Sequence, residues 1–156
     1  MNNVPLDDDF YDFIKGWEQF RGKAYPDEGG IPTIGYGTTV YNRGELVKMG
    51  DMITLEEAEH ELKEGCKSYY RHMLKVLKAE QSKRQLIALL SLCYNIGVPD
   101  FVGSTLLKHI NSGVTNREVI ATQFRRWVHV GHKVSDGLVR RREAEILCYF
   151  MVDTPA

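Results

Sequence analysis

Residues 54–77 have the sequence TLEEAEHELKEGCKSYYRHMLKVL, and they separate two parts of the chain that differ in character. Thr54 and Glu57 have the spacing of a capping box, in which each side chain binds the other residue's backbone N–H. Apolar residues then recur every three or four positions as far as Leu77, which is the helical period. The stretch therefore predicts a helix over residues 55–79, long enough to join two lobes of different structure.

The part before this helix combines one helix with a glycine-rich region. Residues 7–21 have a helical apolar period, with Asp7 or Asp8 as the predicted cap. Residues 22–53 hold seven glycines and two prolines among short β-type runs, which predicts a small antiparallel sheet. Within it, residues 33–41 alternate like a strand, and glycines in such a strand often mark close approach by another element or a ligand.

The part after the long helix is helical throughout. Residues 83–96 are apolar over most of the helix circumference, which predicts the central core helix. A short helix is predicted at 104–112, and Thr115 with Glu118 has the spacing of a second capping box that opens the next helix. A last helix is predicted at 138–151.

These patterns together predict an α+β, mainly helical fold in one domain over residues 1–156. A sheet lobe of residues 22–53 would face a helical lobe made of residues 80–152 and the N-terminal helix 7–21. The helix at 55–79 would join the two lobes.

Composition narrows the possible classes of protein. Apolar residues make up 43% and charged residues 26% of the chain, which permits a hydrophobic core. No apolar stretch approaches a membrane span, and the acidic N-terminus does not resemble a secretory signal, so we expect no stable membrane association and a cytoplasmic location. The histidines and three cysteines have no metal-ligand spacing, and no nucleic-acid motif is present. We therefore expect neither metal nor cofactor, no nucleic-acid partner, and a monomer.

Two carboxylates and a hydroxyl are the candidate chemical groups. Hydrolysis of a glycosidic bond needs one acid to protonate the leaving oxygen and a second carboxylate to activate water. Glu18 lies on or beside an apolar helix stripe, where desolvation favours the protonated acid, whereas Asp27 lies in a polar, glycine-rich turn that favours the ionised form. Thr33, at the start of the predicted strand, could hold the water. Spacing alone also fits ordinary structural roles.

The order Glu18, Asp27, Thr33, followed by Ile34-Gly-Tyr-Gly37, resembles the catalytic signature of the phage-type lysozymes, the endolysins of glycoside hydrolase family 24. The resemblance continues through Leu90–Gly97, through Phe101–Asn111 and through Trp127 with the arginine-rich segment 137–145. It covers about residues 10–150 in the same order.

The resemblance implies a lysozyme-like muramidase with its active cleft between the sheet lobe and the helical lobe. Such an enzyme cleaves the β-1,4 bond between N-acetylmuramic acid and N-acetylglucosamine in peptidoglycan strands and lyses the host cell. Glu18 would be the general acid, Asp27 the base or electrostatic partner, and Thr33 a ligand of the water, with inversion at the anomeric carbon. An arginine would hold Glu18 in place, Arg140 being favoured over Arg141. The protein would wait in the host bacterial cytoplasm until the membrane is permeabilised, then act on the wall.

Three other functions stay open. A lytic transglycosylase would use one glutamate and leave 1,6-anhydro ends, and a wall-binding module would keep the cleft without turnover. A bacteriocin or secreted effector could carry the same catalytic lobe.

The sequence departs from the family pattern in two ways. The near-neutral net charge of −1 differs from the basic character of many relatives, and Glu28 places a second acid beside Asp27.

Overall fold

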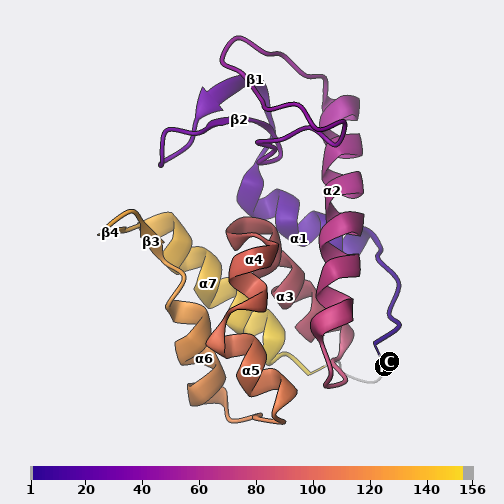
Figure 1. Cartoon of the computed structure of the whole chain (residues 1–156), viewed down its shortest axis with the longest axis vertical. Coiled ribbons are helices and arrows are strands. Elements are labelled where there is room, and N and C mark those ends of the chain that lie inside the picture. The colour runs from indigo at the N-terminus through magenta and orange to yellow at the C-terminus, as the bar shows by residue number, and fades with distance from the viewer. Residues whose placement is uncertain (1, 153–156) are drawn as a thin grey trace. The chain divides into compact units, whose positions relative to one another are not determined.

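The computed structural model describes residues 2–152, which form seven helices and four short strands (Figure 1). In chain order the elements are α1 (Asp8–Glu18), β1 (Arg21–Pro26), β2 (Pro32–Gly35), α2 (Leu55–Val76), α3 (Lys83–Ile96), α4 (Val98–Val102), α5 (Thr105–Asn111), α6 (Arg117–Arg125), β3 (His129–Val130), β4 (Lys133–Val134) and α7 (Asp136–Tyr149). The predicted α+β, mainly helical fold is confirmed.

The described chain divides into two compact units. The N-terminal unit contains residues 7–68, and the C-terminal unit contains residues 2–6 and 69–152. The boundary falls inside α2, the predicted joining helix. Helix α1 belongs to the same unit as β1 and β2, whereas the sequence grouped it with the later helices.

The N-terminal unit is built around an antiparallel hairpin. Strands β1 and β2 pair with Tyr25 opposite Thr33, and a register irregularity separates this pair from Arg21 opposite Gly35. Ala24 of β1 and Ile34 of β2 form one buried cluster with Tyr41 and Val47. Helix α1 begins as predicted, because the side chain of Asp7 accepts a hydrogen bond from the backbone N–H of Asp9.

The predicted strand over residues 33–41 is wrong beyond Gly35. Ile34 and Thr38 exchange two backbone hydrogen bonds of 2.9 Å, so the chain reverses between them. Gly35 and Gly37 have φ angles of +63° and +79°, which lie in the left-handed region that favours glycine. The alternation in the sequence therefore belongs to a strand followed by a tight turn.

The long helix α2 begins where the sequence predicted. The backbone N–H of Thr54 donates to Glu57 Oε1, and the N–H of Glu57 donates to Thr54 Oγ1, both at 3.1 Å. This reciprocal pair satisfies two donors that a helix start leaves without intrahelical partners. At the other end, Asn111 caps α2, because its side chain binds the carbonyl of Val76 and the N–H of Lys78.

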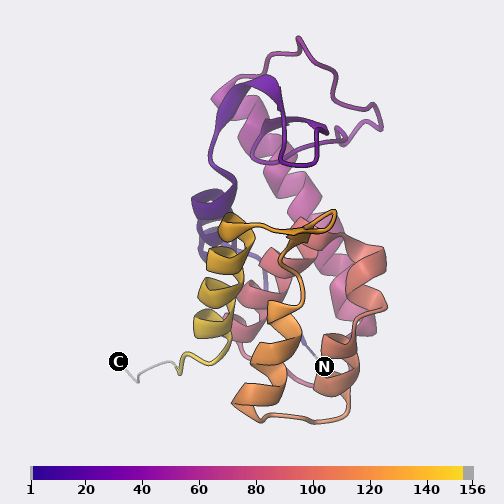
Figure 2. The same ribbon diagram turned by 90° about the vertical axis from the view of Figure 1, so that its left-hand side faces the viewer.

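The C-terminal unit packs its helices around α3, which occupies residues 83–96 as predicted. Every residue from Leu86 to Cys93 is buried, and α3 contacts both α4 and α7. Figure 2 shows the β3–β4 hairpin between α6 and α7, an element that the sequence did not predict. The expected capping box at Thr115 is also wrong, because the Asn116 side chain caps α6 by accepting from the N–H of Val119.

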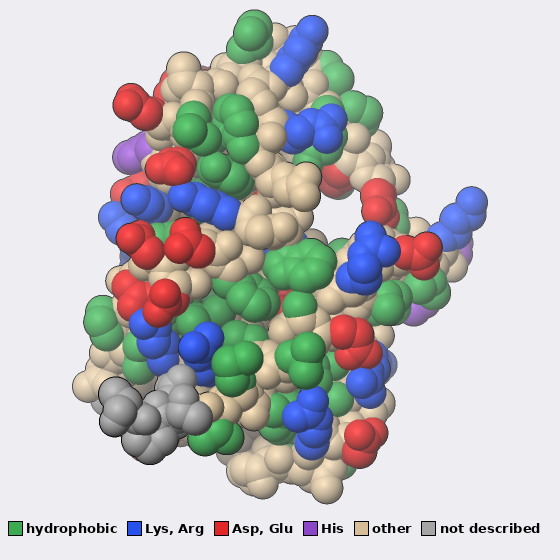
Figure 3. Space-filling model, turned by 180° about the vertical axis from the view of Figure 1, so that it is seen from behind, with side chains coloured by type: hydrophobic (Ala, Val, Ile, Leu, Met, Phe, Trp, Pro, Cys, Tyr) green, Lys and Arg blue, Asp and Glu red, His purple; other side chains and the backbone are tan. Residues whose placement is uncertain are grey.

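The surface and the helices add two observations. On the face drawn in Figure 3, acidic side chains lie among basic ones rather than forming one large patch of a single sign. Within residues 2–152, no helix combines the length and apolar character that crossing a bilayer requires.

Candidate active site

Glu18 is the last residue of α1, and its side chain is half-buried. The chain leaves the helix through Gln19, whose φ of 43° is the only positive value among the described residues other than glycine. The backbone N–H of Gln19 still donates to the carbonyl of Lys15, at 3.0 Å. Helix and turn together therefore fix the point from which the Glu18 carboxyl projects.

The turn after β2 packs directly on this carboxyl. A Cβ atom added to Gly37 would overlap Oε2 of Glu18 and would lie 2.8 Å from its Cδ. Only a residue without a side chain leaves that space, so Gly37 forms one wall for the acid. This is the close approach that glycines in the strand pattern predicted. The sequence did not indicate which glycine of residues 33–41 makes this approach.

Asp27 stands at the tip of the β1–β2 hairpin. Its Oδ1 accepts two backbone hydrogen bonds, from the N–H of Gly29 at 2.8 Å and from the N–H of Ile31 at 2.9 Å. Its own N–H donates to the carbonyl of Ile31. Because both side-chain bonds go to Oδ1, the carboxylate is held in one orientation and Oδ2 is the oxygen left to act as a base.

Thr33 is the second residue of β2, and it is 4% exposed. Its hydroxyl donates a hydrogen bond of 2.8 Å to the carbonyl of Ile31. That bond uses the hydroxyl hydrogen, so the oxygen can still accept a hydrogen bond through its lone pairs. The residue has the chemistry needed to hold a water molecule.

The pKa of Tyr25 is affected by both predicted carboxylates. Burial raises its pKa, and the negative charges of Glu18 and Asp27 raise it further, against the lowering effect of Arg21. Tyr25 is therefore close to both predicted carboxylates and pairs with Thr33 across the hairpin. On the other side, burial and the charge of Glu18 raise the pKa of Cys66 to about 12, which places Glu18 beside α2.

The arginine-rich helix α7 contains a buried ionic cluster that the sequence did not reveal. Glu145 is fully buried, and its Oε1 lies 2.7 Å from Arg142 Nε. Its Oε2 accepts from Ser91 Oγ at 2.5 Å and from Arg141 Nε at 3.4 Å. Arg142 also binds the side chain of Asn95 and the carbonyl of Trp127. The sequence feature that could have indicated this cluster is the spacing of Glu145 from Arg142 (i to i+3) and from Arg141 (i to i+4).

The predicted support of Glu18 by Arg140 or Arg141 stays a prediction. Arg140 is exposed on α7, whereas Arg141 is buried and donates to the carbonyl of Ser91 at 3.0 Å. The structure thus gives Arg141 a structural role within its own unit, beside Glu145.

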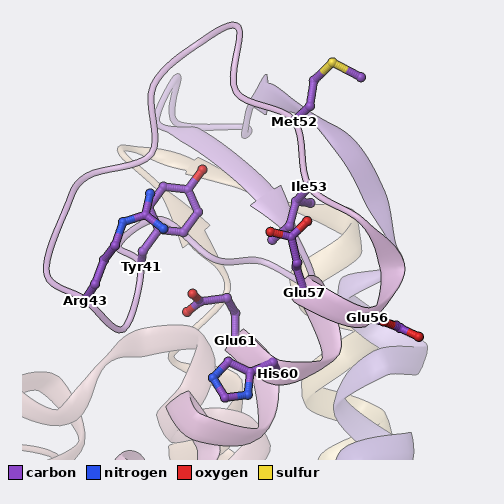
Figure 4. Close-up of a pocket in the computed structure, with 8 residues that line it drawn as sticks. All are labelled: Tyr41, Arg43, Met52, Ile53, Glu56, Glu57, His60 and Glu61. Atoms are coloured by element: carbon purple, nitrogen blue, oxygen red, sulfur yellow. The ribbon is translucent and has the colours of Figure 1, made fainter.

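The N-terminal unit also has a pocket of about 400 Å³ beside the start of α2 (Figure 4). It contains none of the predicted catalytic residues, and it is lined by Tyr41, Arg43, Met52, Ile53, Glu56, Glu57, His60 and Glu61. The guanidinium of Arg43 lies 4.2 Å over the Tyr41 ring. Across residues 2–152, no three histidine, cysteine or acidic side chains gather in a way that could hold a metal ion.

Fold and site together define a lysozyme-like α+β protein, in which a glutamate at a helix end and an aspartate at a hairpin tip approach the same tyrosine. The chain belongs to the phage lysozyme family, which matches it over residues 15–145.

Several known proteins are similar to this chain in sequence or in fold. The endolysin of Salmonella phage P22 is 37% identical over 132 residues, covering 85% of this chain and 88% of its own length. The endolysin of Bacillus phage B103 is also 37% identical, over 133 residues and 85% of this chain. The chain spans only 49% of that relative's length. The structure of the endolysin from Escherichia coli O157:H7 phage FAHEc1 has a TM-score of 0.83 at 34% identity, covering 99% of this chain and 98% of its own.

Proposed function

We propose that this protein is a muramidase that hydrolyses the β-1,4 bond between N-acetylmuramic acid and N-acetylglucosamine in bacterial peptidoglycan. Family membership and the endolysin relatives support the substrate class. The observation that carries the chemistry is the shared environment of Tyr25, which is close to Glu18 and Asp27 and pairs with Thr33. The proposed acid, base and water ligand therefore all lie near this tyrosine.

Each group has a role that its surroundings support. Glu18 protonates the leaving glycosidic oxygen, and Gly37 keeps its carboxyl in place. Asp27 accepts a proton from the attacking water through Oδ2, since two backbone N–H groups hold Oδ1. The water donates its second hydrogen to Thr33 Oγ1. Attack on the face opposite the leaving group inverts the anomeric carbon.

The test is digestion of purified peptidoglycan by the native protein and by Glu18→Gln, followed by mass spectrometry of the products. Glu45→Gln is the matched control, because that side chain is 71% exposed and pairs only with Arg43 in the described chain. We expect reducing muramic acid ends from the native and control proteins and none from Glu18→Gln. Cleavage by Glu18→Gln would refute the assignment of the acid.

The same digest separates the other functions. 1,6-Anhydro ends would identify a lytic transglycosylase, and binding to the wall without released fragments would identify a wall-binding module. We also propose that the protein acts as a monomer and reaches the wall from the host cytoplasm once the membrane is permeabilised. Expression with and without a membrane pore-forming protein tests the route, because lysis should require the pore.

A further inference from the structure

Tyr25 lies near the three residues of the candidate site, and the proposed mechanism gives it no role. It lies in β1 directly opposite Thr33 of β2, two residues before Asp27. Residues opposite one another in an antiparallel pair project from the same face of a sheet. The Tyr25 side chain therefore projects from the same face as the threonine that holds the water.

The Tyr25 ring is contacted by a side chain of its own strand, β1. The guanidinium of Arg21 lies 4.2 Å from the centroid of the Tyr25 ring. A cation over an aromatic face is attracted by the negative potential of that face. One face of the ring is thus covered, and the hydroxyl at the ring's edge is a polar group that a ligand can use.

The hydroxyl differs from those of three other tyrosines in the described chain. Tyr41 donates to Asp51, Tyr70 to the carbonyl of Val4, and Tyr149 to Gln81. Within residues 2–152, the hydroxyl of the half-buried Tyr25 makes no hydrogen bond, although buried tyrosine hydroxyls usually find a partner. Burial and two nearby carboxylates raise its pKa, so the phenol stays protonated and acts as a donor.

We propose that Tyr25 is a further substrate-binding residue of the active site, whose hydroxyl donates a hydrogen bond to an uncharged oxygen of the glycan strand beside the cleaved bond. A sugar hydroxyl or an acetamide carbonyl supplies that acceptor. The inference rests on the proposed muramidase function and adds a contact that helps to place the bond between Glu18 and Asp27.

The experiment compares Tyr25→Phe with Tyr41→Phe, because each variant removes one hydroxyl from a tyrosine of the same unit. Release of muropeptides from purified peptidoglycan gives kcat/KM, and thermal unfolding gives Tm. Retention of Glu18→Gln and of Glu18→Gln/Tyr25→Phe on insoluble peptidoglycan gives binding without turnover. A lost hydrogen bond to a neutral group predicts a kcat/KM about 5- to 10-fold lower for Tyr25→Phe, with a matching loss of binding and an unchanged Tm.

Tyr41→Phe should show the reverse, a lower Tm with native kcat/KM, because its hydroxyl bonds within the protein. If the native protein is active and Tyr25→Phe stays within twofold of it in both cleavage and binding, the proposal is overturned. A clear fall in the Tm of Tyr25→Phe also overturns it, by showing that the hydroxyl is a structural contact. If neither the native protein nor Tyr41→Phe releases muropeptides, the muramidase function fails first and this inference falls with it.

Discussion

Replacement of Gly37 by alanine tests how strictly the turn positions Glu18. The new Cβ would overlap Oε2 and would lie 2.8 Å from Cδ of Glu18. Nonbonded carbon atoms separate to about 3.5 Å or more, so the carboxyl has to move by roughly 1 Å. A misplacement of about 1 Å at a reacting group costs on the order of 100-fold in rate. We therefore expect kcat on peptidoglycan to fall about 100-fold in Gly37→Ala.

The backbone adds a separate cost that needs its own control. Gly37 has a φ of +79°, where a side chain costs about 1–2 kcal/mol. Gly44 has a φ of +99°, and an added Cβ there meets no atom within 4 Å. Gly44→Ala should therefore lose comparable stability in thermal unfolding while keeping the native kcat. Equal activity of the two alanine variants would refute the idea that Gly37 positions the acid.

Three further predictions concern stability. Glu145→Ala should lower the free energy of unfolding by about 3–5 kcal/mol, since it leaves two buried arginines without their anion. The control Glu143→Ala breaks a half-exposed ion pair with an arginine and should lower it by less than about 1 kcal/mol. Urea titration of both variants measures the difference. The pKa of Asp51 lies below its ordinary value of 3.8, through the backbone N–H of a lysine and the Tyr41 hydroxyl. The stabilisation is therefore complete above that pH and is lost as pH falls through the lowered pKa. The Tm gap between native and Asp51→Asn should thus narrow from pH 5 towards pH 2, and a constant gap would contradict the linkage. Gln19→Gly should relieve the backbone at φ 43° and raise the free energy of unfolding by roughly 1 kcal/mol; a lower Tm would show that the conformation is not strained.

The helices were largely predictable because their signals are local and repeated. Helix α3 occupies residues 83–96 as expected, since apolar residues recur along it and Gly97 follows it. Elements without repetition were missed: β3 and β4 have two residues each, too few to show a period. The alternation at residues 33–41 misled because the sequence does not show which glycines adopt positive φ.

The candidate site was only partly predictable, and for a different reason. Glu18, Asp27 and Thr33 were chosen through a family resemblance, because their spacing also fits structural roles. Tyr25 became visible only through the strand register that places it opposite Thr33. The burial of Glu145 was not predictable from the sequence, because polar residues are usually exposed and the arginines that pair with it are brought together only by the fold.

The contacts that orient the proposed base and water ligand are nearly all backbone contacts within a short segment. Two N–H groups hold Asp27, and one carbonyl orients the Thr33 hydroxyl; all three belong to residues 29–31. The backbone of Gly37 also limits the space around the Glu18 carboxyl. Side-chain substitutions elsewhere in the hairpin should therefore preserve the orientation of Asp27, whereas an insertion between Asp27 and Ile31 should disrupt both Asp27 and Thr33 at once. If Asp27 and Thr33 activate water as proposed, we expect that step to depend on the hydrogen-bond geometry within this turn.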